Sequence, residues 1–146
     1  MRRFGQPFQK GISYVRRPGA YAIISDGEDL LLTLQDAYEL ELQLPGGGID
    51  LGETPLRALR REVFEETGYH ITKICHLGVY QRYTFMPEYD LWAHKICHIF
   101  KCTPTLQISD PIEPNHTVVW MDPKSAVCML SNEGDRHFLR QWMVFG

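Results

Sequence analysis

The spacing of apolar residues along the chain first predicts a β-hairpin. The apolar runs at residues 21–24 and 30–34 are each short enough for one buried strand. Asp26-Gly27 lies between them and is a dipeptide typical of tight turns. Residues 35–43 are more polar, so we expect a loop there. Leu42 and Leu44, near its end, would lead a short strand into the glycine run that follows.

The next pattern changes from strand to helix spacing. Leu56, Leu59 and Val63 recur at i, i+3 and i+7, which predicts an apolar stripe on one face of a helix. Thr54-Pro55 supplies a capping side chain followed by the residue favoured at the first helical position. A glycine at position 68 suits the left-handed backbone just past a helix end.

Strand patterns return after this helix. Residues 71–85 contain strand-like segments, residues 86–88 read as a turn, and residues 91–102 predict one long strand. Three prolines within residues 103–116 predict a stretch that is mostly loop. Another short strand is expected at residues 118–121.

The chain ends in two predicted helices. Asp122-Pro123 would open a short helix that ends near Leu130. A second helix is expected from about residue 133 to 144, with Ser131 or Asn132 as its cap. The order of elements predicts the α+β class or a layered α/β/α domain.

Length and composition predict one ordinary domain, residues 1–146, without a membrane span. Residues 1–17 are polar and basic, and we expect a flexible arm or an edge strand there. The formal net charge of −3 disfavours a protein that depends on broad nucleic-acid electrostatics. A nucleotide substrate stays compatible with this charge, because a bound metal supplies local positive charge.

The four cysteines form no C-x-x-C pair, which disfavours a zinc or redox motif. Scattered reduced thiols and the lack of a secretory pattern indicate a cytoplasmic protein. His94 and His98 would share one face of a strand, so a metal pair is one interpretation. Packing or hydrogen-bonding histidines are the simpler interpretation, because no third ligand accompanies the pair.

The predicted central helix carries an unusual concentration of negative charge. Glu62, Glu65 and Glu66 are spaced i, i+3 and i+4, so their side chains lie on one helix face. Their repulsion is relieved by a divalent cation, and oxygen-only ligands favour Mg²⁺ or Mn²⁺ over zinc. A solvated acidic face with ion pairs such as Arg61–Glu65 is the alternative.

The wider stretch resembles the signature of the Nudix hydrolases, G-x5-E-x7-R-E-U-x-E-E-x-G-U, where U is a bulky apolar residue. The matching residues are Gly47, Glu53, Arg61, Glu62, Val63, Glu65, Glu66, Gly68 and Tyr69. Tyr69 is a departure in kind, because the family more often has an aliphatic residue there. The resemblance implies an α/β/α sandwich in which a mixed β-sheet carries a loop–helix–loop catalytic motif.

The resemblance also implies roles for individual residues. Glu62, Glu65 and Glu66 would be metal ligands, together with the carbonyl of Gly46, just ahead of the motif's first glycine. Glu62 would also orient or deprotonate water. Glu53 and Arg61 would brace the glutamates as part of the catalytic machinery. The implied cofactor is Mg²⁺, with Mn²⁺ as an alternative.

In many Nudix relatives the catalytic base lies on a loop after the motif helix. Glu113 is the first candidate for this base, and Glu88 and Asp90 are the next candidates. An ordinary surface carboxylate is the simpler interpretation of each, because nothing in the motif fixes the base.

The implied reaction is Mg²⁺-dependent hydrolysis of the pyrophosphate linkage in a nucleoside diphosphate derivative. The compact length favours a nucleoside triphosphate, as in the MutT-type pyrophosphohydrolases, with ADP-ribose, a dinucleoside polyphosphate or an RNA 5′ end as alternatives. Asn132 could read a purine, although helix capping is sufficient reason for it. A non-catalytic nucleotide-sensing module is the alternative from another class. A homodimer is compatible with the sequence, but nothing in it requires one.

Overall fold

The computed structural model describes residues 1–36 and 39–146, and its strands form one mixed sheet. The elements, in chain order, are β1 (Arg2–Gly5), β2 (Tyr14–Ser25), β3 (Leu30–Asp36), β4 (Leu40–Gln43), β5 (Gly46–Gly48), α1 (Pro55–Thr67), β6 (Tyr69–Met86), the 3₁₀ turn η1 (Pro87–Tyr89), β7 (Leu91–Gln107), β8 (His116–Met121), α2 (Pro123–Met129) and α3 (Glu133–Phe145). The main path through the sheet is β1-β6-β7-β2-β3-β4, while β5 pairs with β2 and β8 pairs with β3. The β1–β6 and β2–β7 pairs are parallel, and the other strand pairs are antiparallel.

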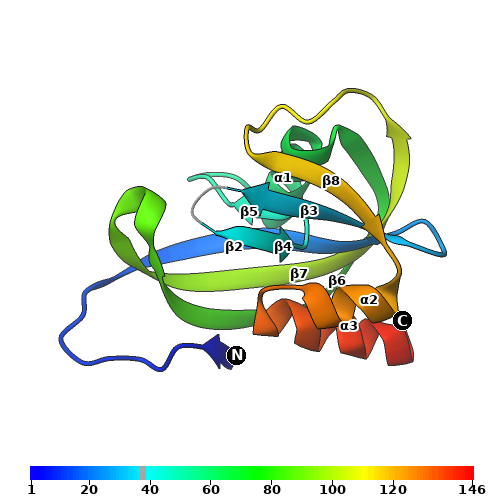
Figure 1. Cartoon of the computed structure of the whole chain (residues 1–146). Helices are drawn as coiled ribbons and strands as arrows, with labels where there is room; N and C mark the ends of the chain where they lie inside the picture. The colour runs from blue at the N-terminus through cyan, green and yellow to red at the C-terminus, as the bar shows by residue number, and fades with distance from the viewer. Residues whose placement is uncertain (37–38) are drawn as a thin grey trace.

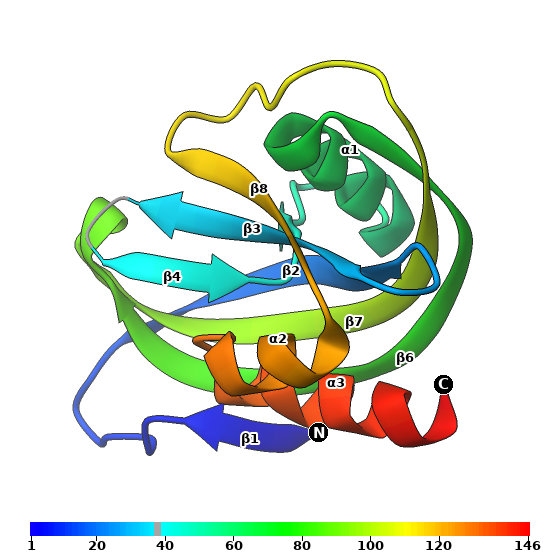
Figure 2. The same cartoon turned by 45° about the vertical axis from the view of Figure 1, so that its right-hand side comes forward.

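The helices lie on both sides of this sheet. Helix α1 covers one face, whereas α2 and α3 lie against the other (Figures 1 and 2). The predicted fold, an α+β sandwich with a mixed sheet, is therefore confirmed.

Each face of the sheet has its own hydrophobic core because side chains alternate along every strand. On β2, Ala20, Ala22 and Ile24 pack toward α1 with Leu59 and Val63 of the helix. The intervening residues of β2 pack toward α3; Ile23, for example, lies in the same core as Phe138 and Leu139. Leu59 and Val63 of the predicted apolar stripe therefore face the sheet, whereas Leu56, the third residue of that stripe, is exposed.

The ends of the helices follow the predicted capping. Thr54 Oγ1 accepts from the Arg57 amide (3.2 Å), and Gly68 has the left-handed φ of 75° that ends α1. Asp122 caps α2 by accepting from the Ser125 amide (3.0 Å). Asn132, rather than Ser131, caps α3, because its Oδ1 accepts from the Gly134 amide (2.9 Å). Helix capping is therefore the role the structure shows for Asn132.

Two predicted loops are partly strand. Strand β7 continues to Gln107, although Pro104 lies within it. The β2–β7 pairing ends at Ile24 and Cys102, so Pro104 has a strand neighbour only on the β6 side, opposite Ile71. Proline is tolerated where the missing amide hydrogen would face no partner.

The predicted loop at 35–43 is also shorter than expected. β3 runs on to Asp36 and β4 begins at Leu40, and the two pair with each other; the part of this prediction at 37–38 lies outside the described residues. At the N-terminus, β1 forms an edge strand against β6, while residues 14–17 already belong to β2.

All four cysteines are free, with Cys97 and Cys102 buried and Cys75 and Cys128 exposed. Among residues 1–36 and 39–146, no helix has the length and apolar character needed to cross a membrane.

Candidate metal centre

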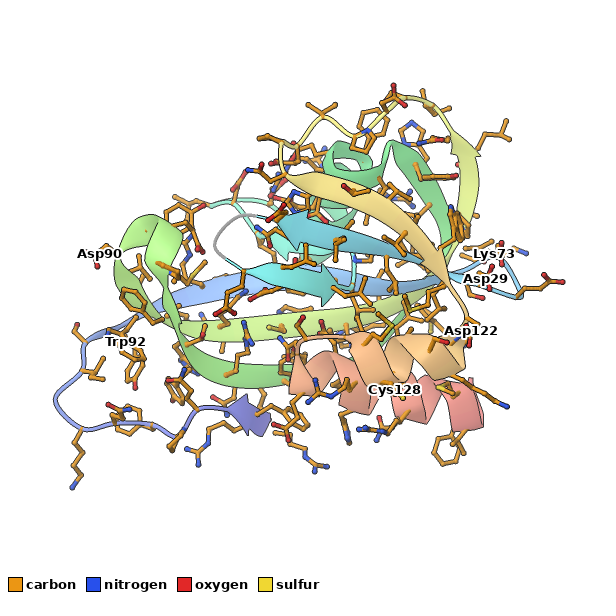
Figure 3. All side chains as sticks on the ribbon, in the orientation of Figure 1. Asp29, Lys73, Asp90, Trp92, Asp122 and Cys128 are labelled. Atoms are coloured by element: carbon orange, nitrogen blue, oxygen red, sulfur yellow. The ribbon has the colours of Figure 1, made fainter. Side chains whose placement is uncertain are left out.

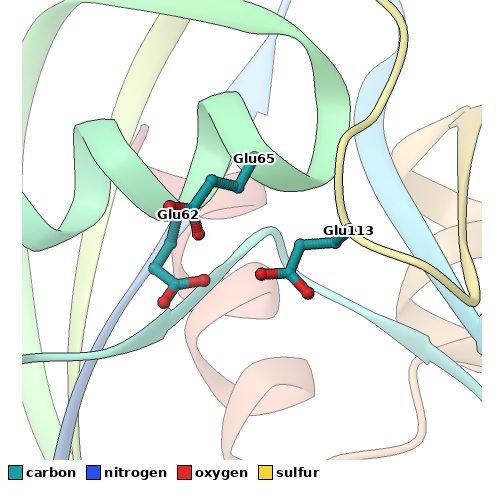
Figure 4. A group of neighbouring side chains, drawn as sticks. All are labelled: Glu62, Glu65 and Glu113. Carbon is teal, nitrogen blue, oxygen red and sulfur yellow. The ribbon is translucent and has the colours of Figure 1, made fainter.

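Three carboxylates meet beside the second half of α1. Glu62 and Glu65 project from the helix, and Glu113 reaches them from the loop before β8 (Figure 4). One ligand atom from each lies within 4.8 Å of the other two. The i, i+3 spacing explains the first two residues, but the third arrives from almost fifty residues further along the chain.

Backbone hydrogen bonds fix the position of the Glu113 loop. The amides of Ile112 and Glu113 both donate to the carbonyl of Glu65, at 2.8 and 2.9 Å. The Ile108 amide donates in the same way to the carbonyl of Gly68 (2.8 Å). These carbonyls belong to the end of α1, where the helix itself supplies no partner. The loop therefore caps the helix and at the same time brings the Glu113 carboxylate to the centre.

Arg61 holds the acidic residues of this region together. Its Nε and Nη2 donate to the two oxygens of Glu53, both at 2.8 Å, as a bidentate pair. Its Nη1 donates to Glu62 Oε1 (2.9 Å) and, at longer range, to Glu65 Oε2 (3.4 Å). Its Nη2 also donates to the carbonyl of Gly48 (3.0 Å). This bond connects α1 to β5, the strand of Gly46, Gly47 and Gly48, which we call the glycine strand. The predicted pairing of Glu53 with Arg61 is thus present, and its catalytic role stays a prediction.

The charges of these glutamates depend on their surroundings. Hydrogen bonds from Arg61 lower the pKa of Glu53 to about 2. Burial raises the pKa of Glu62, although Arg61 opposes this, and burial raises the pKa of Glu66 well above its usual value. A bound cation would favour the charged forms of both groups, so these buried carboxylates are suited to a metal.

Glu66 lies deeper than the three carboxylates of the cluster. It is buried; its Oε1 accepts from the Gly46 amide (3.2 Å), and its Oε2 lies 3.5 Å from His116 Nε2. Its carboxylate therefore contacts the glycine strand from the helix side. The predicted ligand roles of Glu66 and of the Gly46 carbonyl are not tested by these contacts and stay predictions.

The glycine strand needs its missing side chains. A Cβ on Gly46 would overlap the backbone of β2 at Ala20 and Tyr21, and a Cβ on Gly47 would overlap the carboxylate of Glu62. Gly46 also has a φ of 147°, which disfavours other residues. The two glycines thus allow β5 to lie between β2 and the acidic helix face.

Some residues of the centre were not identified from the sequence. Asp50 forms an ion pair with Arg61 (3.4 Å), and His116 faces Glu66. Asp50 lies inside the motif at one of its variable positions, so only its proximity to Glu53 could have indicated it. His116 follows Glu113 by three residues in a proline-rich loop, where the sequence gives no spacing signal.

Other candidates lie elsewhere. Glu88 belongs to η1, and Asp90 follows it at the tip of the β6–β7 connection (Figure 3). Neither joins the group of Glu62, Glu65 and Glu113. His94 Nε2 is hydrogen-bonded to Gln81 Oε1 (2.7 Å), and its ring stacks on Tyr83. These contacts agree with the packing interpretation of His94. Within the described part of the chain, the glutamate cluster is the one group of three or more His, Cys, Asp or Glu side chains close enough to share a metal.

The donor set of this centre fits a hard divalent cation. Carboxylate oxygens are the ligands that Mg²⁺ and Mn²⁺ prefer, and no thiol or imidazole belongs to the group of three. Glu62, Glu65 and Glu113 could therefore share one such ion.

Comparison with known proteins identifies the family of the chain. The NUDIX domain profile matches residues 15–142. A protein of Bacillus subtilis named "Putative 8-oxo-dGTP diphosphatase" is 39% identical over 79 residues, 53% of this chain and 52% of that protein. A "MutT-like protein" of Streptomyces ambofaciens is 30% identical over 93 residues, 64% of this chain and 55% of the relative. The matches thus span about half the length of these curated relatives.

Solved structures extend the likeness to most of the fold. A MutT protein from Bacillus halodurans superimposes with a TM-score of 0.66 at 21% identity, covering 85% of this chain and 80% of its own. A MutT NUDIX hydrolase from Burkholderia pseudomallei gives 0.66 at 22% identity, covering 87% and 98%. At these identities the structures support the fold alone. Together with the profile match over most of the chain, they show that this protein belongs to the Nudix family.

Proposed function

We propose that this chain hydrolyses the pyrophosphate linkage of a nucleoside diphosphate derivative with the help of Mg²⁺ or Mn²⁺. The observation that carries the proposal is the convergence of Glu62, Glu65 and Glu113 within 4.8 Å, beside a strand of glycines. Hydrolysis of a phosphoanhydride requires little covalent help from a protein, because positioning and charge stabilisation supply most of the rate. A carboxylate cluster that can hold a cation, next to the glycines of β5, which carry no side chains, fits this need for positioning and charge stabilisation.

The residues of the centre divide this work among them. Glu62, Glu65 and the deeper Glu66, with the Gly46 carbonyl, would hold the cation. Arg61 fixes the orientation of Glu62 and Glu65 while linking them to Glu53. When bound, the cation neutralises charge on phosphate oxygens and makes water more acidic. Glu113 faces the other two carboxylates from a separate loop, so we assign it to accept the proton of the attacking water. The hydrogen bond from its amide to the Glu65 carbonyl anchors the backbone of this loop beside the cluster.

We propose a nucleoside triphosphate as the substrate, ahead of ADP-ribose or a dinucleoside polyphosphate. Support comes from the relative named as a putative 8-oxo-dGTP diphosphatase. A panel of nucleotides incubated with Mg²⁺ tests this choice through the products. Monophosphate plus pyrophosphate supports the triphosphate proposal. AMP plus ribose 5-phosphate from ADP-ribose, without turnover of triphosphates, would contradict it.

Removal of pyrophosphate from RNA 5′ ends is a second candidate activity. Two relatives named "RNA pyrophosphohydrolase", from Halorhodospira halophila and Bartonella bacilliformis, are 36% and 42% identical over 67 and 66 residues. A 5′-triphosphorylated oligonucleotide added to the panel separates the candidates. A higher kcat/KM for the oligonucleotide than for any mononucleotide would favour the RNA activity. Binding of nucleotides without any turnover would instead favour a sensing module.

A further inference from the structure

A second group of ionisable residues lies on the opposite face of the sheet, toward α3. We call it the polar cluster, and it consists of Arg17 and Tyr21 on β2, Tyr80 and Arg82 on β6, Lys95 on β7 and Asp135 on α3. Tyr21 and Tyr80 belong to the core on this face, which places their neighbours at alternate strand positions on the same side. None of these residues belongs to the Nudix signature.

Strand register lines up three cations within the polar cluster. Arg17 pairs with Lys95 across β2 and β7, and Lys95 pairs with Arg82 across β7 and β6. Neighbouring strands are about 4.8 Å apart, so the three side chains start in one row. Like charges at directly opposed positions destabilise a sheet. An anion bound between them would reverse this effect.

The protein provides little negative charge for this row. Among the described residues, no carboxylate oxygen lies within 4.0 Å of a side-chain nitrogen of Arg17, Arg82 or Lys95. The Nε of Arg82 is buried without a hydrogen-bond acceptor in the described structure. Asp135 is the nearby acid, but its Oδ1 already accepts from the Tyr80 hydroxyl (2.8 Å). Hydrogen-bond donors are therefore in excess here.

Tyr21 connects the row to the glycine strand. Tyr21 pairs with Gly46, and Gly19 pairs with Gly48. The Tyr21 ring lies back over Gly19, because a Cβ on Gly19 would lie only 2.8 Å from the Tyr21 hydroxyl. This direction leads the hydroxyl toward Arg17, the next residue on the same face, and Lys95 Nζ lies 5.6 Å from the ring centre. Arg17 therefore lies one same-face position beyond Gly19, the partner of the last residue of β5.

Part of each residue in this row is exposed to solvent, although the Nε of Arg82 is buried. The side chains of Arg17, Arg82 and Lys95 are each only partly buried. The Arg17 guanidinium packs over the Tyr89 ring at 4.7 Å, which fixes its plane and leaves its N–H edge able to donate. Planar guanidinium groups and a lysine ammonium together are suited to phosphate oxygens.

We propose that Arg17, Arg82 and Lys95, with the Tyr21 hydroxyl, bind a phosphate group of the substrate beyond the scissile pyrophosphate. This inference rests on the proposed function and narrows its substrate class. Nucleoside triphosphates and dinucleoside polyphosphates carry such a phosphate. ADP-ribose does not, because its second group is an uncharged sugar.

Binding of inorganic pyrophosphate to the metal-free protein tests the subsite without any turnover. With EDTA present, the cluster of Glu62, Glu65 and Glu113, which we call the acidic centre, holds no cation that could attract an anion. We expect pyrophosphate to shift the NMR resonances of residues 17, 82 and 95, and Lys95→Met to weaken binding at least about tenfold. Lys101→Met is the matched control, because it changes the same strand and face about 20 Å away. Undetectable binding, or equal loss in both variants, would overturn the proposal.

Kinetics on two substrates separates this proposal from the proposed function. We expect Lys95→Met to raise KM for a nucleoside triphosphate about tenfold with kcat retained, and to leave KM for ADP-ribose unchanged. An equal effect on both substrates would overturn the subsite. If Lys95→Met lowers the thermal unfolding temperature, Arg82→Gln replaces it in both assays with the same expected outcomes. Failure of the wild type to hydrolyse any nucleotide contradicts the proposed function alone, since the metal-free binding assay is independent of catalysis.

Discussion

The two faces of the sheet carry ionisable groups that are organised in opposite ways. On the α1 face, Arg61 contacts acidic residues from Asp50 to Glu65, so most of the negative charge is already ordered before a cation binds. On the α3 face, Arg17, Lys95 and Arg82 lie side by side without a carboxylate partner among the described residues. We therefore propose that the first face binds a cation and the second an anion. A nucleotide with its metal and phosphates requires both.

The two sites also differ in how the chain assembles them. Most of the acidic centre comes from one continuous stretch, residues 46–66, and a single loop adds Glu113. The polar cluster joins residues from 17 to 135 through strand register and the docking of α3. Local spacing therefore specifies the chemistry on one face, and long-range pairing specifies the charges on the other.

The largest expected effect concerns the buried carboxylate of the α1 face. Glu66→Gln removes a charge while its amide oxygen can still accept from the Gly46 amide, so the fold should be retained. If Glu66 supports the metal, kcat with Mg²⁺ should fall about 1000-fold, the equivalent of several kcal/mol. Glu133→Gln, at the exposed start of α3, is the control and should leave kcat unchanged. Near-normal turnover by Glu66→Gln would contradict the metal role.

The next effect tests the loop that joins the acidic helix. Glu113→Gln should lower kcat about 100-fold, because the loop would lose its proton acceptor while its backbone bonds to Glu65 persist. Glu88→Gln in η1 is the matched control, since this glutamate lies outside the acidic group. Steady-state rates across a pH series provide the measurement. Equal rates in the two variants would show that Glu113 is an ordinary loop carboxylate.

A smaller effect, on stability, concerns the α3 face. Tyr80→Phe removes the hydroxyl that donates to the buried Asp135 and should lower the free energy of unfolding by about 1–3 kcal/mol. Burial already raises the pKa of Asp135, so the loss of this donor leaves a poorly solvated carboxyl group. Urea unfolding of both proteins measures the difference. Tyr83→Phe serves as control, and a comparable loss there would mean that the Tyr80 bond contributes nothing specific.

The smallest effect is the pH dependence of the stability that the Arg61–Glu53 ion pair provides. Arg61 lowers the pKa of Glu53 from 4.5 to about 2 in the folded protein. A depressed folded-state pKa gives stability that is present above pH 4.5 and is lost as the pH falls toward 2. The difference in unfolding free energy between wild type and Glu53→Gln should therefore shrink across this window. A difference that stays constant from pH 6 to pH 2.5 would contradict this contribution of the ion pair.

The α1 face could be predicted from sequence because its information is local. The i, i+3 spacing placed Glu62 and Glu65 together, and the capping residues Thr54 and Gly68 defined the helix. The loop carboxylate Glu113 was a candidate, but its arrival depends on backbone bonds to the end of α1 that no spacing encodes.

The α3 face could not be predicted in the same way. That Lys95 lies between Arg17 and Arg82 follows from a parallel and an antiparallel register, and a shift of one residue would send the side chains to opposite faces. The prediction of a loop at Pro104 was wrong for a similar reason. A strand tolerates proline where no second strand lies beside it, and the sequence does not show which positions these are. Sequence patterns describe neighbours along the chain, whereas these features depend on neighbours across the sheet.

The most direct test of the acidic centre is binding of Mn²⁺ followed by paramagnetic broadening of backbone amide resonances. The expected result is selective broadening in the second half of α1 and around Glu113, with Glu62→Gln weakening the affinity at least about tenfold. Broadening centred elsewhere on the chain, or an unchanged affinity in Glu62→Gln, would contradict a metal centre at Glu62 and Glu65 beside Glu113.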